Sequence, residues 1–170
     1  GGGASVERIG DYGIVKLPSY LIEDCIHWAP RSIVYDARNP NDDYVAEPNR
    51  VGFTTFGGCI NVIDPATRQL RRATKKDCGE IARVCDYLDE ICLANRVVNA
   101  TDVPSASQSV HNMEAILKNT GKHFIIGADS PTSLKAMQAL AAVSLNGHQE
   151  LDPESIFSVS VCPVSPLVLP

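Results

Sequence analysis

The chain has 170 residues, of which 44% are hydrophobic and 21% charged, and its formal net charge is −5 at pH 7. These proportions are typical of a globular protein, and the acidic balance argues against a nucleic-acid-binding protein, whose affinity comes from neutralising phosphates. No run of about 18 apolar residues is present, so we expect neither a transmembrane helix nor a membrane partner. The absence of a signal-peptide pattern after the first glycines, together with reduced cysteines, favours the cytoplasm.

Residues 1–72 are predicted to form an accessory region that contains a helix and a β-hairpin. Pro18 to Ala29 carries the apolar stripe of a short helix, which Pro30 ends. Ser32 to Tyr35 is predicted to form a short strand.

The hairpin of this region is predicted between residues 51 and 64. Val51–Phe56 and Cys59–Asp64 are strand-like runs, and the Gly57-Gly58 pair between them suits a two-residue turn. Asp64-Pro65-Ala66-Thr67 indicates a second turn, after which Gln69–Arg72 would return as a strand.

Residues 73–170 alternate between helical and strand-like patterns. Strands are predicted at Arg96–Asn99, at His123–Ile126 and from Ser155 into the Pro-rich segment that ends near Leu167. Helices are predicted from Thr74 to about Asn95, from Ser105 to Thr120, and from Pro131, capped by Ser130, to Asn146. This β-α-β-α-β order predicts an α/β fold with a parallel sheet. We expect the first β/α units of an incomplete TIM barrel, because a barrel has eight such units.

Three of the six cysteines are spaced by seven residues and share an apolar stripe of the first predicted helix. They are Cys78, Cys85 and Cys92. This pattern favours core packing, with a metal or redox role as the alternative. No recognisable set of metal ligands is present, so no metal site is predicted.

Candidate substrate-binding residues lie where the predicted strands end, because ligands of parallel α/β folds bind at the carboxyl ends of the strands. The candidates are Asn99, Asp102, Cys162 and Ser165. Asp102 could balance a cationic substrate or bond its own turn, and Cys162 could be a nucleophile. Asp129 and Ser130 also follow a strand but suit the start of a helix.

A basic stretch interrupts the otherwise acidic sequence. It contains Arg68, Arg71, Arg72, Lys75 and Lys76. The stretch is either a solvated strand and helix start or a docking surface for an acidic protein partner. His123, at the amino end of a predicted strand, is predicted to be structural, since that end of a barrel usually serves stability.

Several segments, in their order and spacing, resemble the trimethylamine methyltransferase family of corrinoid-dependent methyltransferases. They are Val15-Lys16-Leu17-Pro18-Ser19-Tyr20-Leu21, Ala29-Pro30, Phe53-Thr54-Thr55-Phe56-Gly57, Ala73-Thr74-Lys75-Lys76-Asp77, Asp102-Val103-Pro104, Asn119-Thr120-Gly121-Lys122-His123 and Cys162-Pro163-Val164-Ser165-Pro166-Leu167. The resemblance covers nearly the whole chain, as the N-terminal part of a family member.

The resemblance implies a (β/α)8 barrel that moves a methyl group from a methylated amine to the Co(I) of a separate corrinoid protein. The donor would be trimethylamine or a quaternary amine such as glycine betaine. The corrinoid would be supplied by the partner, with no cofactor bound directly, and Asp102 would be the acidic group for the cationic donor. The catalytic residues, and the pyrrolysine of some members, are expected beyond Pro170. Phe53–Gly57 looks closer to relatives without pyrrolysine.

Two other interpretations stay open at this point. The first is a non-catalytic remnant that binds an amine or docks a corrinoid protein, and the second is a barrel enzyme with an unrelated substrate. A homo-oligomer is possible. Because three β/α units cannot close a barrel, we expect these 170 residues alone to expose a sheet edge and aggregate.

Overall fold

The computed structural model describes residues 3–145, 152–153 and 155–160. The chain divides into two compact units, Gly1–Ile33 and a second unit that begins at Val34. Each is described by itself below. The predicted boundary at residue 72 stays a prediction.

The first unit contains an antiparallel hairpin and a helix. Strand β1 (Ser5–Ile9) pairs with β2 (Tyr12–Lys16), and Ile9 lies opposite Tyr12. Gly10 opens the connecting two-residue loop with a φ of 60°, which a type II′ turn requires at that position. Helix α1 (Ser19–Trp28) confirms the predicted helix, and none of its residues is buried. The hairpin itself was missed, although its Gly-Asp turn is a recognisable signal.

The second unit is built on a parallel sheet of four strands in the order β10–β9–β8–β5. Every adjacent pair in this sheet is parallel. The strands are β5 (Phe53–Thr54), β8 (Ile91–Asn95), β9 (Phe124–Ile126) and β10 (Phe157–Val159). The predicted α/β class and parallel sheet are therefore confirmed, whereas the closed eight-stranded barrel stays a prediction.

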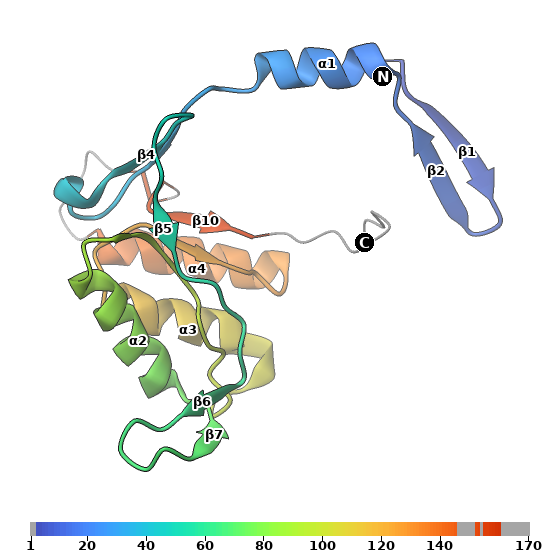
Figure 1. The fold of residues 1–170 in the computed structure, drawn as a ribbon. Helices are drawn as coiled ribbons and strands as arrows, with labels where there is room; N and C mark the ends of the chain where they lie inside the picture. Colours follow the sequence, from blue (N-terminus) through green and yellow to red (C-terminus); the bar gives the residue numbers. More distant parts are fainter. Residues whose placement is uncertain (1–2, 146–151, 154, 161–170) are drawn as a thin grey trace. The chain divides into compact units, whose positions relative to one another are not determined.

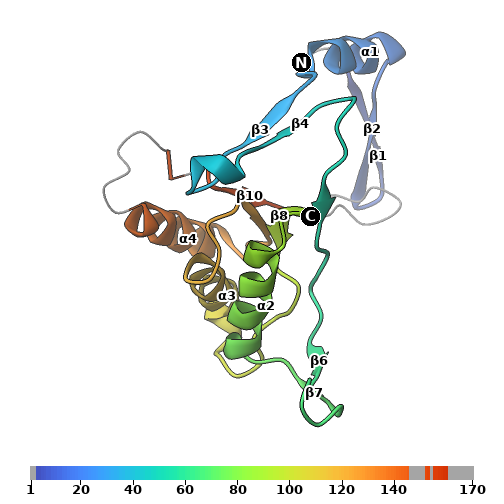
Figure 2. The same ribbon diagram turned by 60° about the vertical axis from the view of Figure 1, so that its left-hand side comes forward.

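Three helices pack together beside the sheet, as Figures 1 and 2 show. Helix α3 packs between α2 and α4. Their bounds are α2 (Lys75–Tyr87), α3 (Gln108–Leu117), which the short helix η2 (Ser105–Ser107) precedes, and α4 (Pro131–Ser144).

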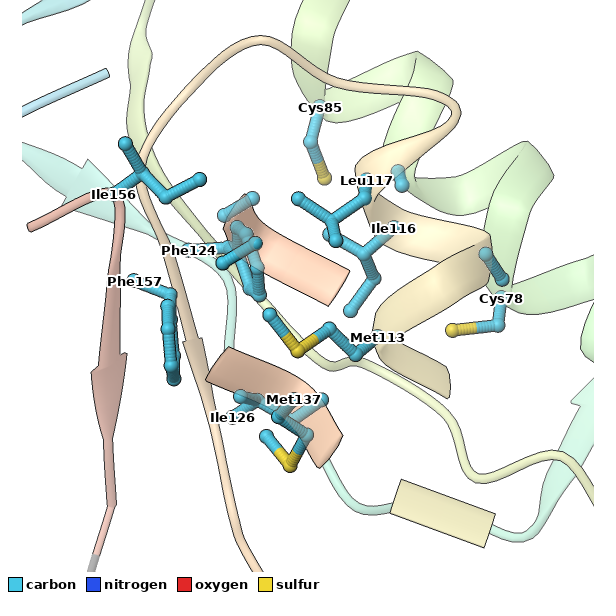
Figure 3. Packing of buried hydrophobic residues seen from close by; sticks show 14 of the residues in the cluster. Cys78, Cys85, Met113, Ile116, Leu117, Phe124, Ile126, Met137, Ile156 and Phe157 are labelled. Atoms are coloured by element: carbon cyan, nitrogen blue, oxygen red, sulfur yellow. The ribbon is translucent and has the colours of Figure 1, made fainter. Parts of the chain in front are cut away.

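The hydrophobic core lies between the sheet and these helices (Figure 3). Phe124 and Ile126 of β9 are each 1% exposed, and Met113 of α3 and Met137 of α4 are fully buried. The rings of Phe124 and Phe157 stack with centroids 5.9 Å apart, which joins β9 to β10. Burying one such side chain contributes roughly 1.5–3 kcal/mol to stability. The core therefore fixes the strands whose ends carry the candidate site.

Two helix starts form as their sequences predict. Thr74 and Asp77 make a reciprocal capping box at α2, in which Thr74 Oγ1 accepts from the backbone N–H of Asp77 and the Asp77 carboxylate accepts from that of Thr74. Ser130 caps α4, and Pro131 is its first residue.

The predicted hairpin between residues 51 and 64 is wrong. Phe53 of β5 pairs instead with Ile91 of β8, so this segment belongs to the parallel sheet. Strand β6 (Asn61–Ile63) pairs antiparallel with β7 (Leu70–Arg72), which confirms the second predicted turn and its returning strand. Gly57 serves a close backbone approach to Arg96 and Val97, just after β8, rather than a turn between paired strands.

The predicted end of α2 near Asn95 is also wrong, because α2 ends at Tyr87 and the next residues begin β8. The buried Lys122 explains this boundary. Its Nζ donates to the carbonyls of Cys85, Leu88 and Ile91 at 3.0, 2.7 and 2.9 Å. The ammonium group thus satisfies carbonyls at the end of the helix. The helix ends eight residues earlier than predicted, and β8 starts five residues before the predicted strand at Arg96–Asn99, which is therefore wrong.

The new boundary changes the cysteine stripe. Cys78 and Cys85 lie in the hydrophobic core, as predicted, whereas Cys92 belongs to β8. Burial raises the pKa of the Cys78 thiol to about 11 and also raises that of Cys85, which suits packing rather than nucleophilic chemistry. Within the described ranges no group of three His, Cys, Asp or Glu residues could hold a metal ion.

A smaller pair of strands precedes the parallel sheet. Strand β3 (Ile33–Tyr35), which confirms a predicted strand, pairs with β4 (Tyr44–Ala46), and the short helix η1 (Pro40–Asp42) lies between them in sequence. Among the helices of the described residues, none has the length and apolar character needed to span a bilayer.

Candidate functional site

The candidate site is the carboxyl edge of the parallel sheet, where the segments that follow β5, β8 and β9 meet. Thr55 Oγ1 accepts from the backbone N–H of Asn95 at 2.8 Å, which ties the end of β5 to the end of β8. The N–H of Arg96 donates to the carbonyl of Ile125 at 3.1 Å and ties β8 to β9. Three loops therefore share one edge, the usual position of ligands in parallel α/β folds.

Gly57 allows the β5 loop to press against the β8 loop. A Cβ built at this position would lie 1.8 Å from the carbonyl oxygen of Arg96 and 2.4 Å from Cα of Val97. Only a residue without a side chain fits there. Beyond it, the backbone N–H groups of Gly58 and Cys59 both donate to the carbonyl of Val97 at 3.1 Å.

Asn99, a predicted substrate-binding residue, lies within a network of side-chain amides. Its Nδ2 donates to the carbonyl of Gly58, and its Oδ1 accepts from Nδ2 of Asn112, both at 3.2 Å. Asn112 is fully buried, and its Oδ1 accepts from the backbone N–H of Ala100 at 3.0 Å. Asn99 thus positions the glycine loop beside β8, and its substrate-binding role stays a prediction.

Asp102, the predicted acidic group, lies at the start of α2. Its Oδ1 accepts from the backbone N–H of Lys75 at 2.8 Å, which satisfies a free donor in the first turn and places a negative charge at the positive end of the helix. The side chain is exposed. The bond that the structure shows for this carboxylate is to Lys75, 27 residues earlier in the chain, and not to the backbone of its own turn. Substrate binding by Asp102 stays a prediction.

Arg96 was not singled out from the sequence, and it is the most unusual residue of this edge. Its guanidinium lies against the β5 and β9 loops: a Cβ on Gly127 would be 3.6 Å from Nη1, and one on Gly58 would be 4.0 Å from Nη2. The Nε atom is buried and has no hydrogen-bond partner among the described residues. Leaving such a group unsatisfied costs about 1–3 kcal/mol. The misplaced β8 boundary hid Arg96, because the sequence pattern put it inside a strand.

The remaining predicted residues have diverse surroundings. Ser130 Oγ accepts from the backbone N–H of Ser133 at 3.1 Å as the cap of α4, and Asp129 beside it is exposed. Cys162 and Ser165 lie outside the described residues.

The basic stretch splits into paired and exposed residues. Arg71 makes two bonds of 2.7 Å to the Asp77 carboxylate and one of 2.9 Å to Asp64. Its guanidinium holds the pKa of Asp77 well below its ordinary value, while backbone donation from Thr67, followed by Arg71, lowers the pKa of Asp64 to about 2.

The other basic residues differ in how far they are engaged. Lys75 Nζ forms an ion pair with Glu114 and lies 3.0 Å from Nδ1 of His111. The exposed basic residues of the stretch are Arg68, Arg72 and Lys76. The Nζ of Lys76 also lies 3.6 Å from Oε1 of Glu80. A docking role for the stretch stays a prediction.

The opposite, amino end of the sheet carries His123, which is 3% exposed. Its Nδ1 lies 3.0 Å from the carbonyl oxygen of Asp36, and its Nε2 lies 2.9 Å from Oγ of Ser158. Burial lowers the pKa of the imidazole. Both ring nitrogens are engaged in bonds within the protein, so the geometry agrees with the predicted structural role.

An apolar cavity of about 530 Å³ lies beside α2 and reaches the carboxyl edge at Thr55 and Val97. Its lining includes Val62, Ile81, Val84 and Leu88. Asp77 also lines it, but this carboxylate already pairs with Arg71. The cavity has few polar groups that could orient a substrate, so we place the candidate site at the strand ends instead.

Together these features define an α/β protein whose polar and charged groups gather at the carboxyl edge of a parallel sheet. A family model described as "Trimethylamine methyltransferase (MTTB)" matches residues 1–170. The chain therefore belongs to the trimethylamine methyltransferase family.

Individual relatives agree with this assignment. The chain is similar to trimethylamine methyltransferase MttB of Desulfitobacterium hafniense, with 39% identity over 154 residues, which covers 91% of this chain and 31% of the relative. It is also similar to MttB of Methanosarcina barkeri, with 29% identity over 161 residues, which covers 92% of this chain and 32% of that protein. The chain thus spans about a third of the length of these curated relatives.

Proposed function

We propose that the full-length protein transfers a methyl group from a methylated amine to the Co(I) of a corrinoid protein. The observation that carries this proposal is the family match over residues 1–170, together with 39% identity to a trimethylamine methyltransferase. Trimethylamine and quaternary amines such as glycine betaine are the proposed donors. The corrinoid belongs to the methyl acceptor, and the chain itself binds no cofactor in this proposal.

The proposed fold of the whole protein is a (β/α)8 barrel, of which the described sheet supplies the first strands. The order of the strands supports this: β5, β8, β9 and β10 follow one another in the chain and are also neighbours in the sheet. All pairs are parallel. In sequence, α2 lies between β5 and β8, α3 between β8 and β9, and α4 between β9 and β10. A barrel grows by adding such units in order.

In this proposal no residue of the chain needs to form a covalent bond with the donor. The nucleophile is the cobalt of the acceptor, so the barrel needs to bind the donor and hold its methyl group in line for attack. The segment that follows β8 offers polar groups for that task, among them Asn99 and the exposed carboxylate of Asp102. We propose that Asp102 stabilises the positive charge of the donor, because a carboxylate favours an ammonium group at short range.

The exposed basic residues Arg68, Arg72 and Lys76 are the proposed docking surface for an acidic corrinoid protein. Charge complementarity of this kind mainly raises the rate of encounter and depends on salt. A non-catalytic protein that binds an amine or docks a corrinoid protein is the alternative function, and the same surface would serve it.

Full-length protein, mixed with a corrinoid protein in the Co(I) state and either trimethylamine or glycine betaine, tests the proposal. We expect the Co(I) absorbance to disappear as the demethylated amine forms in equal amount, which nuclear magnetic resonance measures. Binding of the amine without any demethylation, at several concentrations of active corrinoid protein, would contradict catalysis and favour the non-catalytic alternative.

Substitution of Asp102 tests its proposed role. Asp102→Asn retains an oxygen that can accept from Lys75 N–H but removes the charge. We expect the affinity for a cationic donor to fall by roughly 1–3 kcal/mol, with stability nearly unchanged, as measured by calorimetry and thermal unfolding of the full-length protein. Asp24→Asn, at an exposed carboxylate of α1, is the matched control. Unchanged affinity in a stable Asp102→Asn protein would remove Asp102 from the site.

A further inference from the structure

Arg96 holds a positive charge at the place where the proposed function needs to accommodate a cation. It follows β8 directly, and its backbone is fixed by the bond to Ile125 of β9. Its guanidinium lies beside Gly58 and Gly127, the glycines of the two flanking loops. The side chain therefore reaches across the carboxyl edge of the sheet rather than into bulk solvent.

The guanidinium has no anionic partner in the part of the chain that the structure describes. Its Nε is buried and unbonded, and none of the ion pairs there includes Arg96. Asp129 lies two residues beyond Gly127, yet it is exposed and makes no ion pair with Arg96. An arginine held in this way by packing, with an unbonded Nε, is suited to a planar group with two oxygens.

We infer that Arg96 is a specificity-determining residue that binds the carboxylate of the methyl donor. This inference rests on the proposed function and deepens it: a donor that bears both a quaternary ammonium and a carboxylate fits this edge better than trimethylamine. Arg96 takes the carboxylate by two N–H···O bonds, and Asp102, in the segment after the same strand, stays the acidic group proposed for the ammonium. A donor with only positive charge gains nothing from Arg96 and is repelled by it.

The two neighbouring glycines support this assignment. Side chains at Gly58 and Gly127 would stand within about 4 Å of the guanidinium nitrogens and crowd a group bound there. Asn99 bonds the carbonyl of Gly58 and so holds the β5 loop in place beside Arg96. Asn99 is in this account a positioning residue for the Arg96 environment.

Calorimetry on the full-length protein tests the inference with two probes. Glycine betaine carries the ammonium and the carboxylate, and tetramethylammonium carries the ammonium alone. We expect Arg96→Gln to weaken glycine betaine binding at least about tenfold, on the scale of a lost charge-assisted hydrogen bond, and to leave tetramethylammonium binding equal or stronger. Arg96→Lys, which keeps the charge without the fork, should show an intermediate loss. Arg31→Gln, at an exposed arginine, is the matched control.

The outcomes separate this inference from the proposed function. Two results would overturn the inference and make Arg96 a structural residue. In the first, glycine betaine and tetramethylammonium lose affinity equally in both Arg96 variants. In the second, the variants lower the unfolding temperature and leave the ratio of the two affinities unchanged. Methyl transfer to the corrinoid protein with unaltered donor preference in Arg96→Gln also overturns it but leaves the proposed function intact. A selective loss of glycine betaine binding without any methyl transfer supports the carboxylate site and contradicts the function.

Discussion

The two ends of the parallel sheet differ in how completely their buried polar groups are satisfied. At the amino end, Lys122 and His123 are almost fully buried, and each is satisfied by bonds to the protein. At the carboxyl end, the buried Nε of Arg96 has no hydrogen-bond partner among the described residues. Gly58 and Gly127, in the loops beside it, place no side chain against its guanidinium. Native proteins rarely tolerate an unsatisfied buried group without a reason. From this contrast we propose that the amino end serves stability and the carboxyl end serves binding.

The largest expected effect concerns Lys122. Lys122→Met fills a similar volume but leaves the carbonyls of Cys85, Leu88 and Ile91 without their donor. We expect a loss of about 3 kcal/mol in the free energy of unfolding, measured by urea denaturation of the full-length protein, with donor affinity unchanged in the folded fraction. Lys135→Met, at an exposed position of α4, is the control. A stable Lys122→Met protein with impaired donor binding would reverse the roles assigned to the two ends.

The next effect concerns Gly57 at the carboxyl end. Gly57→Ala would force a methyl group against the carbonyl oxygen of Arg96 and move the β5 loop away from β8. We expect about 2 kcal/mol of destabilisation from overpacking, together with weaker donor binding in the protein that remains folded. In Gly13→Ala the new methyl group meets only Val6, at an ordinary 3.5 Å, and should change neither property. Normal donor affinity in Gly57→Ala would show that this loop lies outside the site.

The smallest effect is a pH dependence from His123. Burial lowers the pKa of its imidazole below the ordinary value of 6.5, so the unfolded chain takes up a proton that the folded protein resists. The contribution of His123 to the free energy of unfolding is therefore complete above pH 6.5. It falls as the pH decreases below 6.5, by up to about 1.4 kcal/mol per pH unit. Unfolding measured from pH 8 to 5 should show this slope in the parent and in His27→Gln but not in His123→Gln. An identical slope in all three proteins would exclude His123 as its source.

Local signals explain what could be predicted from the sequence. The capping box of Thr74 and Asp77 and the Ser130-Pro131 start of α4 involve residues three or fewer positions apart, and both form as predicted. The turn that begins at Asp64 also stands, since the Asp64 carboxylate accepts from the nearby backbone N–H of Ala66 and Thr67. Such interactions are visible in a short window of sequence.

Contacts between distant residues explain what could not be predicted. The pairing of β5 with β8 joins residues about forty positions apart, for example Phe53 and Ile91, and no local pattern distinguishes it from a hairpin. The end of α2 depends on Lys122, more than thirty residues further along the chain. The same error hid Arg96, because its importance follows from where β8 ends. The strand-end rule placed Asn99 at the carboxyl edge, where the structure has it, and its role in binding stays a prediction.

Hydrogen–deuterium exchange of the full-length protein, with and without glycine betaine, tests the contrast between the two ends most directly. We predict slower exchange on binding in peptides that cover residues 55–59, 96–104 and 127–130, and no change in the peptide that covers residues 120–123. Protection confined to residues 120–123, with the three loops unchanged, would contradict the assignment of the carboxyl edge as the binding site.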